Sequence, residues 1–386
     1  MPVYSYEKKG KAHYYYAFEV KKPDGKRKTI KKYGFTSDKA ANKAEQLARV
    51  EWEQQTYVDT SKITVYQYLQ EWLSIKKNIS EESKKVYTFF INKHVKDGFG
   101  SILLQKVTVH DLKKFISKLS EKDLSESTIK KIYNILQTAF NTATKEELII
   151  KNPFAQLDKG YKPIAKKTIV EFWTKDEVKE FFSRYEKSED PRIKILYTLA
   201  IYTGMRRGEI LGLSWKNIDL DNGVIRISQT LTPSRIKKGA KTATSERSIT
   251  VSTHVLSELK KHKVMMIKER WEMLDKYSGE PSIVETLREN YDKLDLVICQ
   301  PNGNPINVSR FTSNWKTLIN RLKMRTIRFH DLRHTCASLL LSTGTHPKVV
   351  QELLGHSSVK ITMDIYSHML PNMQKEAVET LDKLLK

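Results

Sequence analysis

The chain has 386 residues, of which 39% are hydrophobic and 29% charged, and its formal net charge is +23. This length is typical of two or three domains, and the polarity excludes a membrane protein, because no stretch approaches the ~20 apolar residues of a membrane helix. So large an excess of positive charge favours a polyanionic partner, since neutralising phosphates releases counterions. Nucleic acid is the first candidate, and composition alone leaves an anionic membrane surface open.

The first residues and the cysteines indicate a compartment. The opening MPVYSYEKKGK lacks the apolar core of a signal peptide. Cys299 and Cys336 could pair in principle, but two cysteines form no disulfide framework in a chain of this size. We therefore expect a reducing cytosol as the location.

Residues 1–57 are predicted to form strands followed by a helix. An aromatic strand over 13–20, a turn at 23–25 and a basic strand over 26–33 predict a hairpin. Ser37 is a candidate N-cap for a helix from 38 to about 55. The apolar face of this helix is expected to contain Ala41, Ala44, Leu47 and Ala48.

The hairpin is strongly basic. Between positions 8 and 32 it has ten Lys or Arg residues and two acidic ones. A two-stranded ribbon of this kind can enter a DNA groove, although such charges can also form a solvated sheet face. The candidate DNA-binding residues are Lys26, Arg27, Lys28, Lys31 and Lys32.

Residues 62–160 are predicted to be helical. Apolar residues recur at helical spacing in four segments, which start near Tyr66, Val86, Leu112 and Ile129. We interpret these stripes, including the one that contains Phe89, as core and not as a cofactor site. The Asn-Pro pair at 152–153 ends the bundle, and 159–167 is a basic linker.

The last region, 168–386, mixes helices with a few strands. Thr174 and Glu177 predict a capping box, followed by an apolar helix over 193–202. Short strands at 224–228 and 248–251 flank a basic turn. Residues 254–293 form a long, charged, mostly helical stretch to which the sequence assigns no function, and apolar helices follow it.

Four local patterns in this region carry chemically suggestive side chains. Each has an ordinary alternative: an arginine can pair with a nearby glutamate, a histidine can be buried, a lysine can be solvated, and most tyrosines are core or surface. Their combination and order make chance unlikely as an explanation. The patterns are Thr203-Gly204-Met205-Arg206-Arg207-Gly208-Glu209, then Gly239-Ala240-Lys241-Thr242, then His330-Asp331-Leu332-Arg333-His334, and finally Leu354-Gly355-His356 with Tyr366 ten residues later.

These residue types suit the breaking of a DNA phosphodiester without ATP or metal. A tyrosine oxygen can keep the bond energy in a covalent intermediate. Arginines bind the non-bridging phosphate oxygens bidentately and stay charged as the transition state forms. Histidine and lysine can transfer the protons of the attacking phenol and the leaving 5′ oxygen. The sequence suggests no metal site, because the histidines lack partners at zinc-ligand spacing, and no nucleotide cofactor follows from it.

In this order the patterns closely resemble the tyrosine recombinase family, the phage integrases and their conjugative-transposon relatives. The likeness is strong over 170–386, fair over 62–160 and weaker over 1–57, which resembles the arm-binding domain of such integrases. The resemblance implies that the catalytic residues are Arg206, Lys241, His330, Arg333, His356 and the nucleophile Tyr366.

The resemblance also implies a multidomain fold. Residues 1–57 are expected to form a small α+β arm-type DNA-binding domain, a three-stranded sheet with a helix. Residues 62–160 are expected to form an all-α, SAM-like core-binding domain. Residues 168–386 are expected to form the mainly α catalytic domain with a small β-sheet. Its tail helix at 377–385 would dock onto a neighbouring protomer, although such a helix can also pack on its own domain.

The implied function is site-specific recombination through a 3′-phosphotyrosyl intermediate, which integrates and excises a mobile element. The implied partners are double-stranded DNA at core and arm sites, three further protomers in a tetramer on DNA, and excision or DNA-bending accessory proteins, with no membrane partner and no cofactor. The implied place is the cytoplasm of a bacterial host, at the nucleoid when DNA is bound. Two alternatives are a monomeric type IB topoisomerase-like enzyme, which the arm-like N-terminus disfavours, and a catalytically inactive DNA-binding regulator, which the complete residue set disfavours.

Overall fold

The computed structural model describes most of the chain, in two compact units, Met1–Lys167 and Thr168–Lys386. Each unit is described by itself. The described residues are 3–8, 10–21, 27–53, 63–77, 79–164, 170–188, 191–233, 235–239, 246–366, 382 and 385.

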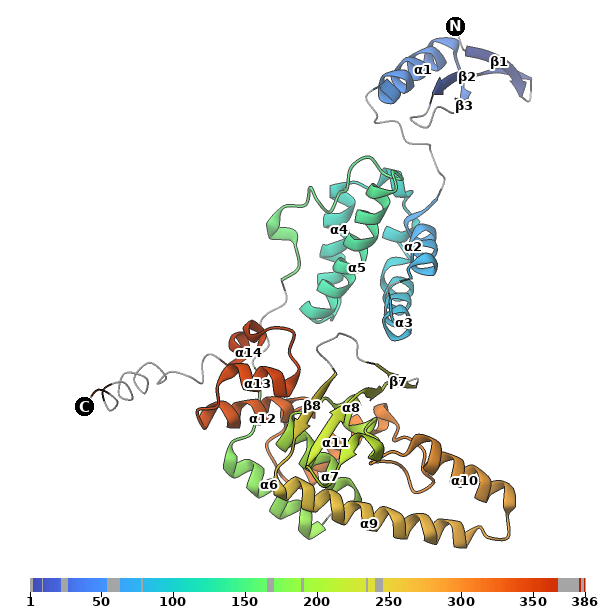
Figure 1. The fold of residues 1–386 in the computed structure, drawn as a ribbon. Helices are drawn as coiled ribbons and strands as arrows, with labels where there is room; N and C mark the ends of the chain where they lie inside the picture. Colours follow the sequence, from blue (N-terminus) through green and yellow to red (C-terminus); the bar gives the residue numbers. More distant parts are fainter. Residues whose placement is uncertain are drawn as a thin grey trace. The chain divides into compact units, whose positions relative to one another are not determined.

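The N-terminal part is a three-stranded antiparallel sheet with one helix (Figure 1). The strands are β1 (Val3–Lys8), β2 (Lys11–Lys21) and β3 (Arg27–Phe35), paired in that order, and the helix is α1 (Asp38–Glu53). Aromatic and β-branched residues of β2 and β3 form a small core with α1, in which Tyr16, Phe18, Ile30 and Ala48 are buried. The predicted three-stranded-sheet-plus-helix fold is confirmed.

The predicted apolar face of α1 is wrong at one position. Ala41 and Ala48 are buried, but the Leu47 side chain is 55% exposed. Leu47 precedes Ala48, so on an α-helix its side chain points about 100° away from the buried stripe. Small alanines thus line the contact with the sheet, and the larger leucine lies outside it.

Four α-helices form the middle part, as predicted. They are α2 (Val65–Ile75), α3 (Glu81–Phe90), α4 (Val109–Ser120) and α5 (Glu126–Lys145). Each begins at a Ser or Thr whose hydroxyl accepts a backbone N–H bond from the first turn, which satisfies one of the unpaired donors there. Short segments complete it: a π-helical turn η1 (Ile91–Val95) and 3-10 turns η2 (Phe99–Ser101), η3 (Leu104–Lys106) and η4 (Lys159–Tyr161).

The core of this bundle holds most of the predicted stripe residues, including Phe90 at its edge, but not Val86 and Phe89 of α3. Val86 is 46% exposed and Phe89 is 54% exposed. The α-helix changes at Ile91 into the π-helical turn that carries buried His94. A π-turn adds a residue per turn, so a 3.6-residue spacing that spans positions 86–94 does not mark one continuous face.

The second unit is mainly helical with a small sheet, as predicted, and its described residues also contain a second, two-stranded sheet. Strands β4 (Ile218–Asp219), β5 (Val224–Ile227) and β8 (Arg247–Thr250) form one antiparallel sheet, and β6 (Gln229–Leu231) pairs with β7 (Ile236–Lys238). The helices are α6 (Lys175–Ser188), α7 (Pro191–Thr203), α8 (Arg207–Leu211), α9 (Thr253–Lys276), α10 (Pro281–Leu294), α11 (Val308–Arg321), α12 (Asp331–Ser342), α13 (Pro347–Leu354) and α14 (Val359–Tyr366), with a 3-10 turn η5 (Trp215–Asn217).

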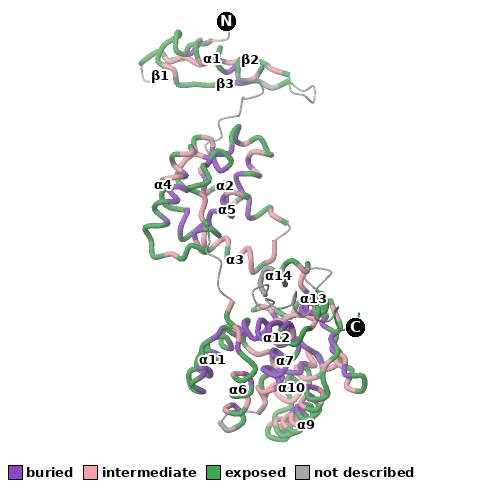
Figure 2. Tube along the Cα trace, turned by 90° about the vertical axis from the view of Figure 1, so that its left-hand side faces the viewer, coloured by how far each residue is buried: buried purple, intermediate pink, exposed green. Residues whose placement is uncertain are grey.

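Helices α7 and α12 are the central pair of this unit. They pack against each other, and Figure 2 shows long buried stretches along both. The predicted capping box before α6 is present, since Thr174 N–H donates to the Glu177 carboxylate at 2.7 Å and Glu177 N–H donates back to the Thr174 hydroxyl at 3.3 Å. The stretch 254–293 is a pair of helices, α9 and α10. None of the helices in the described residues is long and apolar enough to cross a membrane.

Candidate active site

The site is built around the C-terminus of α13. An α-helix leaves its last carbonyls without an intrahelical partner and carries roughly half a unit of negative charge at that end. Here three successive carbonyls, which we call the α13 carbonyl triplet, each accept a hydrogen bond from a different arginine, so three guanidinium groups converge. The bonds run from Arg247 Nε to the Leu353 carbonyl at 2.8 Å, from Arg333 Nη2 to the Leu354 carbonyl, and from Arg206 Nη2 to the Gly355 carbonyl at 3.0 Å.

Two glycines make this convergence sterically feasible. Gly355 ends α13 in the left-handed conformation, with φ of 66°, which glycine adopts without strain. Gly204 follows α7 with φ of 62°, and a Cβ built there would lie 2.5 Å from Leu354 Cδ2. The Gly204 carbonyl accepts a second bond from Arg333, from Nη1 at 2.7 Å. The Gly204 and Gly355 of the two sequence patterns therefore serve the same contact region.

Arg206 is held by Glu209. Arg206 Nη1 donates to Glu209 Oε1 at 2.8 Å, and the Arg206 backbone N–H donates to Oε2 at 2.8 Å. This ion pair is the ordinary alternative to a catalytic role that the sequence allows for Arg206. The pair does not enclose Arg206, whose side chain remains 38% exposed, whereas Arg333 is only 3% exposed.

Sequence inspection missed Arg247. Its guanidinium donates to both oxygens of Glu209, from Nη1 at 3.2 Å and from Nη2 at 2.9 Å. Burial alone would raise the pKa of the Glu209 carboxyl, but the bonds and charge of Arg247, with those of Arg206, outweigh it and lower that pKa. The signal in the sequence is strand periodicity: Arg247 lies two residues before buried Ile249, so both point inward from β8.

The histidines lie around the same arginines. His356 follows Gly355 directly; its Nδ1 lies 2.9 Å from the hydroxyl of buried Thr362, and its carbonyl accepts a bond from Gln351 Nε2 at 2.8 Å. Burial, followed by the charges of Arg333 and Arg206, lowers the pKa of His356 to about 3. The ring is thus neutral at physiological pH, and Nε2 is the nitrogen left to face a substrate.

His330 and His334 occupy the start of α12. His330 is the N-cap residue of that helix, and its ring packs edge-to-face on His334 with centroids 5.3 Å apart. Desolvation by the surrounding protein, together with the charge of Arg333, lowers the pKa of His330. Burial, followed by the neighbouring His330, lowers the pKa of His334 to about 4.

The other two predicted catalytic residues are described only in part or not at all. Tyr366 is the last residue of α14, which packs on α13, so its backbone belongs to the same C-terminal group of helices. Lys241 lies at 240–245, outside the described residues, and so does most of the tail at 377–385. Arg206, Arg333 and His356 are brought together, with His330 beside them on α12. In the part of the chain that the structure describes, no group of three His, Cys, Asp or Glu side chains is placed to hold a metal ion.

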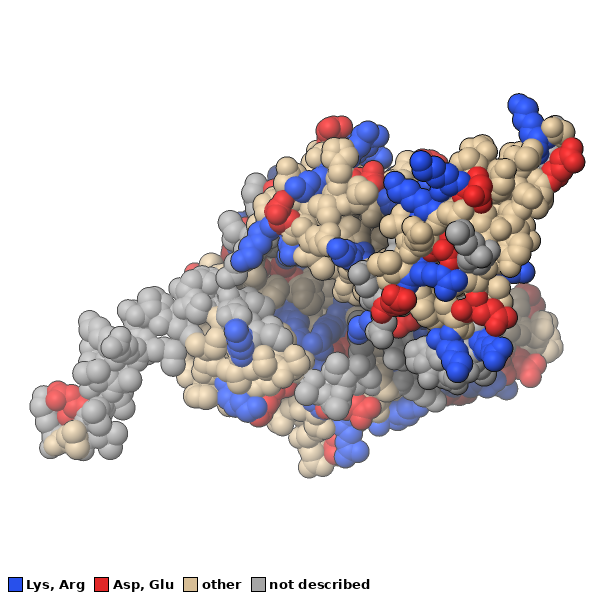
Figure 3. Space-filling view, turned by 90° about the horizontal axis from the view of Figure 1, so that it is seen from above, with Lys and Arg blue, Asp and Glu red and all other residues tan. Residues whose placement is uncertain are grey.

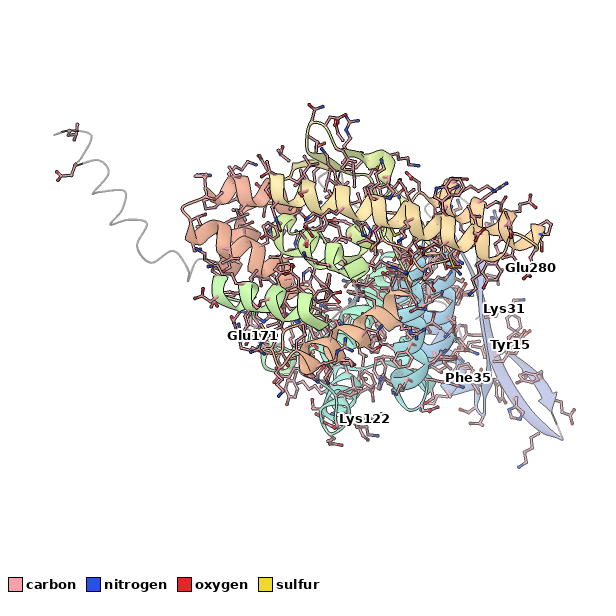
Figure 4. All side chains as sticks on the ribbon, turned by 90° about the horizontal axis from the view of Figure 1, so that it is seen from below. Tyr15, Lys31, Phe35, Lys122, Glu171 and Glu280 are labelled. Atoms are coloured by element: carbon pink, nitrogen blue, oxygen red, sulfur yellow. The ribbon has the colours of Figure 1, made fainter. Side chains whose placement is uncertain are left out.

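The predicted DNA-binding lysines of the N-terminal sheet are divided between its faces. Ile30 is buried against α1, and side chains alternate along a strand, so Lys32 lies on the α1 side and Lys31 on the outer side. Arg27 shares the outer side with Lys31, and its side chain is 76% exposed. Figure 4 labels Lys31 and Tyr15 on this sheet. Lys26 and the side chain of Lys28 lie outside the described residues.

The outer face also carries a cluster of aromatic rings. Tyr15 stacks on Tyr33 with centroids 4.5 Å apart and on Tyr4 at 5.1 Å, and Tyr6 packs edge-on against Tyr33 at 5.9 Å. Tyr4 is 49% exposed and Tyr33 is 58% exposed. Basic and aromatic side chains therefore lie together on the outer face. On the face that Figure 3 shows, Lys and Arg are interspersed with acidic residues.

Comparisons with known families agree with this geometry. A model described as the phage integrase family matches residues 171–373, an arm DNA-binding domain model matches 2–50, and a phage integrase N-terminal SAM-like domain model matches 64–120. The chain belongs to the phage integrase family. It is a tyrosine recombinase of the phage or conjugative-transposon type, an enzyme that breaks and rejoins DNA.

Individual relatives support the same assignment. The ICEBs1 integrase of Bacillus subtilis (strain 168) is 32% identical over 301 residues, which cover 77% of this chain and 76% of that protein. A XerC-like tyrosine recombinase of Caldanaerobacter subterraneus subsp. tengcongensis is 29% identical over 98% of both chains. The fold is similar to that of the Tn1549 transposon integrase in complex with circular-intermediate DNA, with a TM-score of 0.68, 21% identity, and coverage of 83% of this chain and 99% of that one. It also resembles a lambda integrase dimer bound to a core site, with a TM-score of 0.57, 18% identity, and coverage of 94% and 93%.

The low pKa of His356 makes stability depend on pH. Between its ordinary pKa of 6.5 and its folded value of about 3, the unfolded state binds a proton that the folded state does not. Stability must therefore fall as the pH drops through this window. We expect the thermal unfolding midpoint to decrease from about pH 7.5 to about pH 5.5, and His356→Gln to reduce that decrease. Equal slopes in the variant and the parent protein would contradict a half-buried, neutral His356.

Proposed function

We propose that Tyr366 is the nucleophile of a site-specific integrase. Its phenol oxygen attacks a scissile phosphate, a bond forms between that oxygen and phosphorus, and the bond from phosphorus to the 5′ oxygen breaks. The products are a 3′-phosphotyrosyl link and a free 5′-hydroxyl. The 5′-hydroxyl of a partner duplex then attacks the link, which restores the phosphodiester and releases the tyrosine. Repeating the exchange on the second pair of strands resolves the junction.

The arginine arrangement supports this proposal most strongly. Arg206 and Arg333 come from α8 and α12, yet both guanidinium groups are bonded to adjacent carbonyls of the α13 carbonyl triplet. Their spacing suits two donors that hold the non-bridging oxygens of one phosphate as charge builds up in the transition state. A fixed arrangement of this kind costs no reorganisation when the reaction occurs.

We propose that histidine and lysine side chains assist proton transfer. We propose that His330, beside Arg333, takes the proton of the attacking phenol or donates a hydrogen bond to the scissile phosphate. Lys241 gives a proton to the leaving 5′ oxygen. His356 is neutral, and in the tautomer whose Nδ1 accepts from the Thr362 hydroxyl it donates a hydrogen bond from Nε2 to a phosphate oxygen. These roles rest on the sequence patterns and on the placement of the two histidines.

The parts of the chain divide the DNA contacts. We propose that residues 168–386 are the catalytic domain. This domain binds the core site together with the helical domain at 62–160. The sheet at 1–57 binds separate arm sites through its outer face, where Arg27 and Lys31 lie beside the tyrosine cluster. Four protomers act together, and the tail at 377–385 connects neighbours. We also propose accessory proteins for excision or DNA bending, and a cytoplasmic location at the bacterial nucleoid.

The main alternative enzyme class is a type IB topoisomerase. The match of residues 2–50 to an arm DNA-binding domain favours the integrase, because a site-independent topoisomerase needs no second DNA target. Relaxation of supercoiled plasmids that lack any attachment site, without strand exchange between two sites, would support the topoisomerase instead.

The nucleophile is tested by Tyr366→Phe. The variant lacks only the phenolic oxygen, so it should bind core-site DNA like the parent protein and form no covalent protein–DNA adduct. A nicked suicide substrate resolved on a denaturing gel measures the adduct. Covalent adduct with Tyr366→Phe would disprove the assignment.

The arginine roles are tested by neighbouring substitutions. Arg206→Ala should lower the cleavage rate by ~10²–10³, the usual cost of one transition-state donor. Arg207→Ala is the matched control, because Arg207 donates to the Thr312 hydroxyl and not to the α13 carbonyl triplet. It should leave the rate close to that of the parent protein. Equal losses from the two substitutions would leave no basis for assigning the role to Arg206.

The arm domain is tested by deletion of residues 1–57. Two linked DNA-binding modules gain affinity through effective concentration, so removing one weakens the assembly without altering the chemistry. Core-site cleavage should persist and integrative recombination should be lost. Lys31→Glu should reproduce part of that loss. Lys32→Glu, on the opposite face of the sheet, is the control and should not. Normal recombination by the truncated protein would show that the sheet is only a charged surface.

A further inference from the structure

We infer that Arg247 is a positioning residue of the recombinase, which holds Arg206 in its cleaving orientation by fixing both Glu209 and the end of α13. This inference rests on the proposed function of Arg206. We assign Arg247 no phosphate contact, because its Nε and both terminal nitrogens already donate to the Leu353 carbonyl and to Glu209. It lies on β8, six residues after Lys241 in the sequence but outside every pattern that marks the candidate site.

The contacts of Arg247 join three separate elements. From β8, its Nε reaches the Leu353 carbonyl at the end of α13, and its two terminal nitrogens reach the two oxygens of Glu209 on α8. An arginine can do this because its planar fork presents donors in fixed directions. The same two partners, Glu209 and the α13 carbonyl triplet, are those that hold Arg206. The Arg247 guanidinium thus fixes the position of both groups that hold Arg206, Glu209 and the end of α13.

Charge gives the arrangement a second consequence. The Glu209 side chain is only 7% exposed and faces two cations, Arg247 from β8 and Arg206 at the start of α8. A buried carboxylate that loses one partner keeps its desolvation cost, so the remaining partner must compensate for more of it. Without Arg247, Glu209 would draw Arg206 toward itself and away from a phosphate. The positive charge that Arg206 offers to DNA therefore depends on Arg247.

Lysine cannot replace this arrangement fully. It supplies the same charge, which would keep Glu209 neutralised, but from a single nitrogen that cannot span Glu209 and the Leu353 carbonyl together. Arg247→Lys and Arg247→Gln therefore separate the two contributions. Arg226→Gln is the matched control, since Arg226 is an exposed arginine on the adjacent strand β5, opposite Ser248 in the β5–β8 register.

The experiment measures core-site affinity and the single-turnover cleavage rate at saturating protein, on a nicked suicide substrate, for the full-length protein and each variant. Arg247→Gln should bind the core site with unchanged affinity and cleave more slowly by on the order of 10²-fold, the scale of a small misplacement near the chemistry. Arg247→Lys should recover part of that rate, and Arg226→Gln should cleave like the parent protein.

Thermal unfolding of each variant, with assays run well below its midpoint, shows that folded protein is being compared. Should Arg247→Gln fail to fold, Arg247→Lys decides, because the inference requires it to bind normally and cleave slowly. Parent-like cleavage by Arg247→Gln, or by Arg247→Lys when the Gln variant does not fold, would overturn the inference. A uniform loss of affinity with an unchanged rate at saturation would overturn it too. Absence of cleavage by the parent protein itself would instead count against the proposed function.

Discussion

The end of α13 is the constraint on which the active site depends. Three carbonyls in a row accept hydrogen bonds from Arg247, Arg333 and Arg206, which come from β8, α12 and α8. Three guanidinium groups repel one another, and the negative end of a helix dipole offsets part of that repulsion. The Glu209 carboxylate offsets more. Positive charge still exceeds negative charge among these groups, and this local excess suits a DNA phosphate.

The same contacts explain why the surrounding backbone takes the form it does. The left-handed glycines at 204 and 355 let the loop after α7 and the loop after α13 approach closely. His356 follows from this geometry, because the residue after Gly355 must leave α13 beside the arginines. The hydrogen bond to Thr362 of α14 then ties His356 to the helix that ends at Tyr366. The placement of the arginines and that of the helix that ends at Tyr366, the proposed nucleophile, are therefore two results of one packing arrangement.

Sequence patterns predicted the helical core because these features are local, whereas the candidate site residues came from the resemblance to a family. The capping box at Thr174 and the stripes of α2, α4 and α5 depend on neighbours within a few residues, and glycine next to arginine marks a tight turn. Leu47 and Phe89 were predicted to be buried and are exposed, because burial depends on which side another element covers. Arg247 was missed because strand periodicity shows only that its side chain points inward. Its partners, Glu209 and Leu353, are 38 and 106 residues away, and periodicity does not identify partners so distant in the sequence.

Our central claim is that the α13 carbonyl triplet positions Arg206 and Arg333 to bind a single phosphate. A crystal structure of the full-length protein on a core-site duplex, with the scissile phosphate next to Tyr366, tests it most directly. We predict that Arg206 and Arg333 both lie within hydrogen-bond distance of the non-bridging oxygens of that phosphate while keeping their bonds to the Gly355 and Leu354 carbonyls. Arginines bound to different phosphates, or released from those carbonyls when DNA binds, would contradict the claim.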